Sequence, residues 1–243
     1  MQVLGTTLLY LVLGARHHAA GHPLPERVLW IGAHPDDEAY VAPLLGRSCA
    51  EGSGRCSLLV MTRGEAGGDP VVRAAEMQRA SELFHASLTL WDLSDVGGDV
   101  VQIWSTEAGG HDALLQRINS LIADEQPTII YTFDPNHGSS CHPAHRAVGA
   151  LVIEAIARLP NAPRLLLVET TVEFLPNDFI FGSATPDAMV IDATLTWHYL
   201  VEDVEAHGSQ FTREQVEALR NLPAAERRVW LATAPAQKYS CDK

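Results

Sequence analysis

The stretch that decides the fold is RVLWIGA, residues 27–33, which leads directly into HPDDE, residues 34–38. The first segment is short, apolar and flanked by polar residues, a pattern that predicts a strand buried on both faces of a sheet. Segments of the same kind recur along the chain at 57–62 (SLLVMT), 88–93 (LTLWDL), 128–133 (TIIYTF) and 164–170 (RLLLVET).

Helical patterns lie between and after these runs, with apolar residues recurring every three or four positions. Alternating strands and helices form right-handed βαβ units, so we expect an α/β fold with a mainly parallel sheet. Ligand sites in such folds lie beyond the carboxyl ends of the strands. The expected helices span 38–47, 71–85, 112–123, 144–159, 194–207 and 212–222, and shorter strands are expected near Phe179 and Met189.

Length and charge limit the kinds of partner that the chain can have. Its 243 residues are enough for one α/β domain with a sizeable core. Thirty acidic and 17 basic side chains give a formal net charge of −13. Phosphate backbones and anionic membranes repel a chain this acidic, so we expect a small-molecule or glycoconjugate partner and no nucleic acid.

The N-terminus allows two interpretations. The apolar run at 3–15 is too short for an ordinary transmembrane span but fits the core of a signal peptide, although no Lys or Arg precedes it. The alternative is an ordered N-terminal element that packs on the domain. We expect residues 1–22 to be a signal peptide or an extension and 23–243 to be a single domain. The protein would then be exported, with a cytoplasmic location as the alternative.

The four cysteines bear on the same question. Cys49 and Cys56 bracket the turn-like stretch AEGSGR, which would let the two thiols meet. A disulfide there would agree with export, whereas free or semi-buried thiols would not require it. No cysteine falls in a CxxC pattern, so none is assigned to metal.

The segment after the first strand concentrates one imidazole and three carboxylates in His34, Asp36, Asp37 and Glu38. A divalent cation would relieve this density of negative charge, and mixed nitrogen and oxygen donors suit zinc better than calcium. Adjacent Asp side chains cannot point the same way, so we expect one to bind metal and the other to act as a base. The alternative is a solvated loop with an Asp cap, and for Glu38 we favour a first-turn residue that complements the helix dipole.

A second cluster, HPAH at 142–145, follows the fourth predicted strand. Two His residues three positions apart at a helix start reach one cavity. Catalytic zinc sites use three protein ligands and leave one position open. His34, Asp37 and one residue of this pair would make such a set, and the spacing leaves open which of the two it is.

Together these segments resemble the LmbE-like, or PIG-L-like, family of zinc-dependent N-deacetylases. The resemblance extends over residues 27 to about 210 and implies a Rossmann-like three-layer sandwich that holds one zinc ion. The matching stretches are AHPDDE at 33–38, MTRGEAGG at 61–68, Arg73 with Glu76, Asp95, HPAH at 142–145 and HGSQ at 207–210.

The resemblance also implies a role for each residue of the two clusters. His34, Asp37 and His145 match the metal ligands of the family, and Asp36 matches the general base. His142 matches the residue that stabilises the oxyanion or protonates the leaving amine.

Other matches are weaker. Arg73 and Asp95 match positions that hold the sugar or its substituent, although they are also typical of an exposed helix charge and a turn residue. The glycines within 61–68 are expected to let a loop pass close to substrate. His207 is expected to be a packing or supporting residue rather than a ligand.

The chain departs from the family pattern at three positions. Ala144 stands where an Asp usually orients the neighbouring His, so we expect His142 to be less basic and its tautomer less fixed, unless Asp134 or another carboxylate substitutes. Ser140 stands where some relatives have an oxyanion-donating Tyr, and Cys141 stands where Gly is common.

The expected activity is zinc-dependent hydrolysis of an N-acyl group, N-acetyl first of all, on an amino sugar or glycoconjugate. One alternative is an amidase for a non-sugar N-acyl metabolite or thiol conjugate. Another is a catalytically weakened, metal-binding carbohydrate-binding module, which Ala144 motivates and the intact Asp36 disfavours. A dinucleotide-binding protein is rejected because AHPD occupies the place of the Gly-rich turn.

Overall fold

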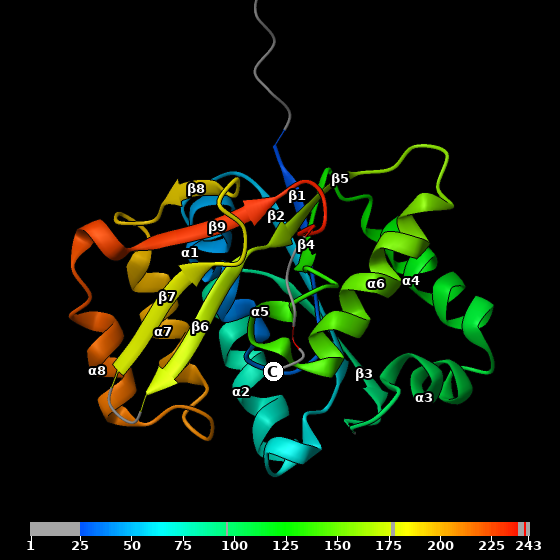
Figure 1. Cartoon of the computed structure of the whole chain (residues 1–243), viewed down its shortest axis with the longest axis horizontal. Helices are drawn as coiled ribbons and strands as arrows, with labels where there is room; N and C mark the ends of the chain where they lie inside the picture. The colour runs from blue at the N-terminus through cyan, green and yellow to red at the C-terminus, as the bar shows by residue number, and fades with distance from the viewer. Residues whose placement is uncertain (1–24, 96, 176–177, 238–240, 242–243) are drawn as a thin grey trace, which may run out of the picture.

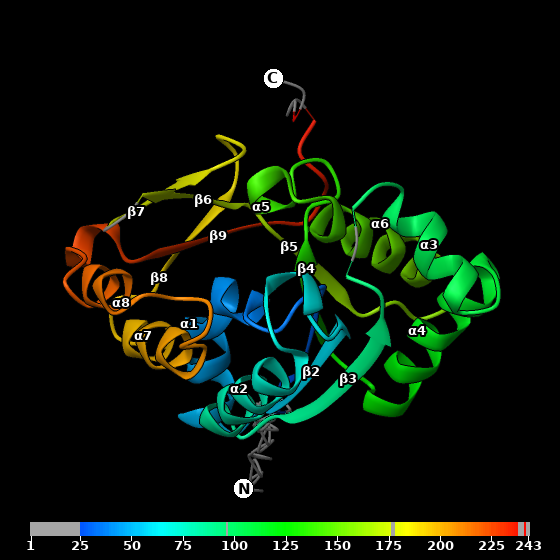
Figure 2. The same cartoon turned by 90° about the horizontal axis from the view of Figure 1, so that it is seen from below.

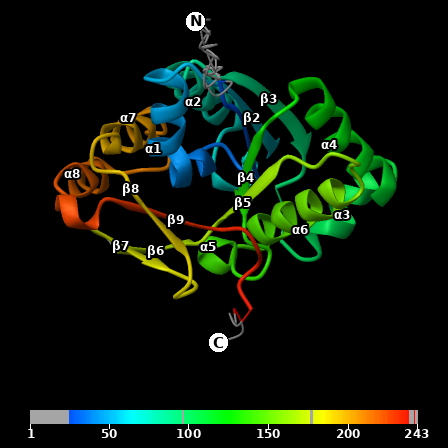
Figure 3. The same cartoon turned by 90° about the horizontal axis from the view of Figure 1, so that it is seen from above.

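The computed structural model describes residues 25–95, 97–175, 178–237 and 241. The expected signal peptide or extension at 1–22 lies outside these residues. The described part of the chain forms a sheet with helices against both of its faces (Figures 1, 2 and 3).

The sheet has seven strands in the order β3-β2-β1-β4-β5-β9-β8. Neighbours from β3 to β5 are parallel, and β9 pairs antiparallel with both β5 and β8. This confirms the expected α/β fold with a mainly parallel sheet. The strands are β1 (Arg27–Gly32), β2 (Arg55–Thr62), β3 (Ser87–Leu93), β4 (Ile129–Phe133), β5 (Arg164–Val168), β8 (Met189–Asp192) and β9 (Arg228–Ala232).

The helices form the two outer layers of the sandwich. Helices α3, α4 and α6 lie on one face of the sheet, and α1, α2, α7 and α8 lie on the other (Figure 3). The described helices are α1 (Ala42–Leu45), α2 (Pro70–Leu83), α3 (Val100–Glu107), α4 (His111–Glu125), α5 (Gly138–Cys141), α6 (Pro143–Ala157), α7 (Trp197–Ala206) and α8 (Arg213–Arg220), with shorter turns η1 (Asp37–Val41), η2 (Gly46–Ala50), η3 (Glu65–Gly67) and η4 (Ala224–Glu226).

Strand β1 lies in the middle of the parallel part, which explains its uninterrupted apolar sequence. It pairs with β2 on one side and β4 on the other, and every residue of β1 after Arg27 is buried. Because β1 is central, the HPDDE segment emerges from the middle of the sheet at the carboxyl ends of its neighbours.

Three segments differ from the sequence expectation. The helix expected over 38–47 is instead a succession of η1, α1 and η2. Pro43 lacks an N–H to donate to residue 39, so a regular helix restarts at Ala42. Helix α3 and strand β9 were not expected from the sequence.

A two-stranded antiparallel hairpin, β6 (Thr170–Leu175) and β7 (Asp178–Ser183), forms a separate small sheet. The strand expected over 164–170 therefore ends at Val168, and the chain turns into β6. Two backbone bonds tie the base of the hairpin: Glu169 N–H donates to Trp230 O at 2.9 Å, and Ala184 N–H donates to Glu169 O at 3.0 Å. The strands expected near Phe179 and Met189 are β7 and β8.

All four cysteines are paired. The Cys49–Cys56 disulfide joins η2 to β2, so of the two alternatives for these thiols the disulfide is the one observed. A second disulfide, Cys141–Cys241, ties the C-terminal segment to the loop before α6 and was not expected. Among the helices of the described residues, none is both long enough and apolar enough to cross a membrane.

Candidate active site

The turn after β1 is built around the carboxylate of Asp37. Its Oδ2 accepts hydrogen bonds from the backbone N–H groups of Ala33 and His34, both at 2.8 Å. Asp36, the residue directly before Asp37, has a left-handed backbone with φ 107° and ψ −13°. The turn therefore points the two carboxylates in different directions, as the sequence predicts for adjacent Asp residues.

The three predicted ligands, His34, Asp37 and His145, converge at this turn. Asp37 Oδ1 lies 2.9 Å from His145 Nε2, and His34 Nδ1 lies 3.2 Å from the same nitrogen. His145 Nδ1 contacts the carbonyl oxygen of Gly138 at 3.0 Å, so that nitrogen carries the proton and Nε2 presents a lone pair. A lone pair that faces a carboxylate needs a cation between the two, and this donor set fits zinc.

His34 is held in the complementary tautomer. Its Nε2 contacts Asp95 Oδ1 at 3.2 Å, which leaves Nδ1 directed at the other two ligands. Burial alone would lower the pKa of His34, but the carboxylates of Asp37 and Asp95 outweigh it and raise that pKa to about 10. The surroundings of His34 thus favour a positive charge, whether a proton or a metal ion supplies it.

Asp36 lies beside the ligands and is held by Arg73. One terminal nitrogen of the guanidinium lies 3.1 Å from Asp36 Oδ1, and the other donates to Gly64 O at 2.7 Å. Burial and the charge of Asp37 raise the pKa of Asp36 to about 7, against the opposing effect of Arg73. A carboxylate that titrates near neutral pH is suited to take up and return a proton.

The glycines of the 61–68 segment make room for that guanidinium. A Cβ atom at Gly64 or Gly67 would collide with Arg73 Nη1. Gly64 and Gly67 thus lie close to Arg73, and their expected approach to substrate stays a prediction. Arg73 and Asp95 are both buried and line the cavity described below, and each contacts another site residue. Their role in binding substrate stays a prediction.

His142 is the N-cap of α6, and its Nδ1 accepts a hydrogen bond from the backbone N–H of Ala144 at 3.3 Å. The neutral imidazole therefore carries its proton on Nε2, and a main-chain group fixes this tautomer whatever side chain residue 144 bears. That this tautomer is less fixed than it would be beside an Asp at position 144 stays a prediction. Burial and the neighbouring His145 and His34 lower the pKa of His142 to about 4, in line with the expected loss of basicity.

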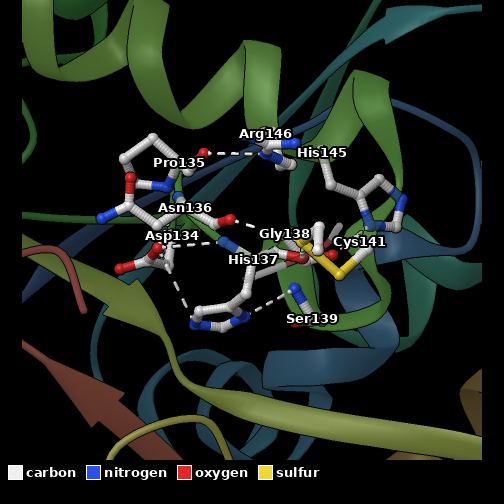
Figure 4. Close-up of a disulfide and its surroundings, with 10 residues drawn as sticks. Asp134, Pro135, Asn136, His137, Gly138, Ser139, Cys141, His145 and Arg146 are labelled. Atoms are coloured by element: carbon white, nitrogen blue, oxygen red, sulfur yellow. Dashed lines mark hydrogen bonds and ion pairs between the residues drawn. A yellow bond between two sulfur atoms is a disulfide. The ribbon is translucent and has the colours of Figure 1, made fainter. Parts of the chain in front are cut away.

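The loop between β4 and α6 rests on a buried group formed by Asp134, His137 and Glu169. Asp134 and His137 are shown with the loop in Figure 4. Asp134 accepts from the backbone N–H of Asn136 at 2.6 Å and of Ala236 at 2.7 Å, so it supports this loop. His137 Nδ1 accepts from Ser139 N–H at 2.9 Å, and its Nε2 contacts Glu169 Oε2 at 3.2 Å.

The same loop contains two residues with left-handed backbones, Ser139 at φ 61° and Cys141 at φ 59°. Cys141 is held by its disulfide with Cys241 immediately before His142 (Figure 4). Two signals in the sequence indicate that this loop is supported: a polar segment after a strand and a Cys with no assigned role. Neither signal identifies Glu169 or Cys241 as the partners, because both lie far along the chain.

A second buried group supports the HPDDE turn. Glu38 Oε1 lies 2.6 Å from His207 Nε2, and Asp203 lies beside them. The expectation that Glu38 is a solvated first-turn residue is wrong because its side chain is fully buried, although its Oε2 does accept the Asp36 N–H at 3.2 Å. The supporting role expected for His207 agrees with this contact.

The site opens into a cavity of about 390 Å³, within the range of small-molecule sites. Tyr40 lines it and was not singled out from the sequence. Its hydroxyl is hydrogen-bonded to Ser140, while burial and the nearby Asp37 and Asp36 raise the pKa of the phenol far above its usual range. The phenol of Tyr40 is thus hydrogen-bonded to Ser140, the residue at the position where some relatives are expected to have a Tyr.

Comparison with known proteins agrees with this geometry. The profile of the PIG-L family, described as GlcNAc-PI de-N-acetylase, matches residues 29–156. The probable N-acetyl-alpha-D-glucosaminyl L-malate deacetylase 2 of Bacillus subtilis (strain 168) is 30% identical over 210 residues, which cover 82% of this chain and 90% of that protein.

Two solved structures show the same fold at lower identity. The N,N'-diacetylchitobiose deacetylase from Pyrococcus horikoshii has a TM-score of 0.64 and 19% identity, covering 86% of this chain and 84% of its own. A conserved protein from Thermus thermophilus has a TM-score of 0.63 and 20% identity, covering 90% of this chain and 99% of its own. On the sequence matches, the chain belongs to the PIG-L, or LmbE-like, family of N-deacetylases.

Proposed function

We propose that this protein is a zinc-dependent hydrolase that removes an N-acyl group, N-acetyl in the first instance, from an amino sugar or glycoconjugate. The observation that carries the proposal is the convergence of His34 Nδ1, Asp37 Oδ1 and the lone pair of His145 Nε2 beside Asp36. The names of the relatives, which describe deacetylases of N-acetylglucosaminyl compounds and of diacetylchitobiose, support the sugar.

His34, Asp37 and His145 would hold the metal. Zinc at such a site polarises the amide carbonyl and lowers the pKa of a water molecule. The contacts of His34 with Asp95 and of His145 with Gly138 keep both imidazoles in the tautomer that ligation needs. The contacts with Asp95 and with Gly138 O are therefore part of the proposed metal centre, together with its three ligands.

Asp36 is the proposed proton carrier. Its carboxylate takes a proton from the attacking water and then returns it to the amide nitrogen as the C–N bond breaks. Arg73 holds Oδ1 of this carboxylate in place throughout, because its guanidinium is itself fixed by backbone carbonyl groups. Hydrolysis releases the carboxylic acid and the free amine.

His142 is the proposed donor to the oxyanion. Its Nδ1 is occupied by the Ala144 N–H, so the proton on Nε2 is available to the carbonyl oxygen as negative charge develops there. The lowered pKa of His142 favours a neutral imidazole that donates a hydrogen bond over an imidazolium that acts as the acid. The amine proton then comes from Asp36.

The test is an amine-release screen with metal control. Purified protein is analysed for zinc, stripped with a chelator, reloaded, and assayed on N-acetylglucosamine, its glycosides and diacetylchitobiose. We expect about one zinc per chain and amine release that chelation abolishes and zinc restores. Tight binding of an acetamido sugar without turnover by the zinc-loaded protein would support the binding module instead, and turnover of only non-sugar amides would support the amidase.

A further inference from the structure

The cavity continues beyond the polar site into a compartment with apolar walls. We call this compartment the apolar arm. Its walls come from β6, β7, α7 and the segment before α8, none of which contributes a proposed catalytic or metal-binding residue. The arm is lined by Val172, Phe179, Phe181, Trp197, Leu200 and Phe211.

One wall is the inner face of the β6–β7 hairpin. Val172 pairs with Phe181 in the antiparallel register, so their side chains point to the same side of the hairpin. Ile180, the intervening residue, points the opposite way and is 50% exposed. The face of the hairpin with Val172 and Phe181 therefore lines the cavity, and the face with Ile180 is exposed to solvent.

Helix α7 forms the facing wall. Trp197 and Leu200 are 2% and 6% exposed, and the rings of Phe181 and Trp197 meet edge to face with centroids 5.8 Å apart. Phe179 and Phe211 contribute two further rings, whose centroids lie 6.5 Å apart. Apolar cavities of this kind favour apolar ligands over water.

The order of the strands in the sheet indicates whether the apolar arm lies on the sugar side or the acyl side of the scissile amide. His34 and Asp37 follow β1 and His145 follows β4, whereas Asp95 follows β3, two strands from β1 on the side away from β4. The hairpin continues from β5, on the other side of β1. The scissile carbonyl therefore has polar groups suited to a sugar on one side and the apolar arm on the other.

We propose that the arm holds the acyl chain of the substrate and that this chain is longer than acetyl, so the preferred substrates are amides of aliphatic or aryl-aliphatic acids. The proposal rests on the proposed function and specifies its substrate. The reaction is the same hydrolysis: water adds to the acyl carbon, the C–N bond breaks, and a medium-chain carboxylate leaves with the amine.

The test varies the acyl chain while the sugar stays constant. Zinc-loaded protein is assayed on N-acetyl-, N-butanoyl-, N-hexanoyl- and N-octanoylglucosamine, and on the octyl glycoside of N-acetylglucosamine. We expect kcat/KM to rise about three- to fourfold per added methylene over the first additions, on the order of tenfold from acetyl to butanoyl. A flat or falling series overturns the proposal, as does a gain confined to the octyl glycoside, which would place the aglycone in the arm.

Two variants locate the effect. Val172→Trp narrows the arm, and we expect it to lower the octanoyl-to-acetyl ratio of kcat/KM on the order of tenfold. Ile180→Trp adds the same ring to the outer face of the same hairpin, and the ratio should stay as in the parent protein. Equal loss in both variants would contradict the assignment of the arm.

Binding of octanoate and acetate, measured by calorimetry, separates this proposal from the proposed function. We expect octanoate to bind more tightly than acetate and Val172→Trp to remove the difference. Octanoate binding without any amine release would retain the arm and overturn the hydrolase, whereas acetyl turnover with equal binding of the two acids would do the reverse.

Discussion

At the scale of single residues, Asp36 combines an unusual backbone with an unusual acidity. A non-glycine residue at φ 107° costs on the order of 1–3 kcal/mol and persists where its surroundings fix it. Here the fixing contacts are the guanidinium of Arg73 at the side chain and Glu38 at the backbone N–H. The strain therefore falls on the residue proposed to move the proton.

Substitution of Asp36→Asn tests that role. Asn tolerates the same backbone but cannot take a proton, so we expect kcat to fall on the order of 10²–10⁴-fold while bound zinc is unchanged. Amine release and metal analysis of the same preparation give both quantities. Asp92→Asn, an exposed change on β3, is the matched control, and near-normal turnover by the Asp36 variant would remove Asp36 from the mechanism.

The raised pKa of His34 gives a prediction for stability. A histidine whose pKa is about 10 in the folded chain and about 6.5 in the unfolded chain stabilises the fold fully below the lower value. That contribution is lost as pH rises through the upper value. We expect the melting temperature of chelator-treated protein to fall from about pH 7 to about pH 10, and zinc to reduce the fall because it replaces the proton.

Scanning calorimetry with chelator and with zinc measures both curves. His207, whose pKa is also raised, to about 9, contributes to the same fall, so a His34→Gln variant isolates the part due to His34. Identical curves for the parent and this variant under chelation would contradict the prediction.

The sequence predicted these residues well where they adjoin one another along the chain. His34, Asp36 and Asp37 share one turn, and the residue types alone suggested a metal and a base. The contact of His142 with the Ala144 N–H was not predictable. The Asp that usually orients this His is replaced by Ala144, and the backbone N–H of the same residue makes the contact instead.

At the scale of elements, the pair of Glu38 and His207 connects η1 to the end of α7. The charge of Glu38 adds to burial in raising the pKa of Asp203 well above its usual range. Both side chains of the pair are fully buried, so the pair couples the position of the HPDDE turn to the helix behind it.

His207→Ala should therefore be strongly destabilising. The change leaves the Glu38 carboxylate unpaired in the interior beside a cavity, and breaking a buried pair in this way costs about 3–5 kcal/mol. His198→Ala, on the exposed side of the same helix, should change the free energy of unfolding by no more than about 0.5 kcal/mol. Denaturant titration of both variants measures the difference, and equal values would show that the pair has no structural role.

Periodic elements were the most predictable. Helices α2, α4, α6 and α8 lie within a few residues of the ranges that apolar spacing predicts, since each buries one side of its surface. Strand β9 has no such signal, because its place between β5 and β8 comes from pairing with segments far along the chain. Pro43 lies within the helix predicted over 38–47, and a proline at such a position interrupts a regular helix.

At the scale of the whole molecule, the two disulfides close loops of very different length. Cys141 and Cys241 are 100 residues apart, and Cys49 and Cys56 are 7 apart. Chain-entropy estimates give about 4.7 kcal/mol for the longer loop and about 2.5 kcal/mol for the shorter one. The pairs also support the proposal that the protein is exported to an oxidising compartment.

Replacing each pair by serines tests the estimates. We expect the Cys141→Ser, Cys241→Ser double variant to lose about 2 kcal/mol more than the Cys49→Ser, Cys56→Ser double variant. Guanidinium denaturation under non-reducing conditions measures both losses. A larger loss from the shorter loop would mean that local contacts, rather than loop closure, set the contribution of these bonds.

The fold class and the polar half of the site were predictable because the family motifs lie at strand ends. The apolar arm was not, because its walls come from β6, β7, α7 and the segment before α8, which meet only in three dimensions. No spacing within residues 170–211 indicates which apolar side chains face the proposed ligands and which face the core.

The β6–β7 hairpin forms its own sheet, and backbone hydrogen bonds at its base join it to the larger one. We therefore expect insertions, deletions and side-chain exchanges within residues 170–183 to leave the seven-stranded ladder and the proposed ligands intact. Among relatives that retain HPDDE and the paired histidines, we expect this hairpin to diverge fastest. Exchanging it between relatives is then the least disruptive way to exchange their substrate preferences.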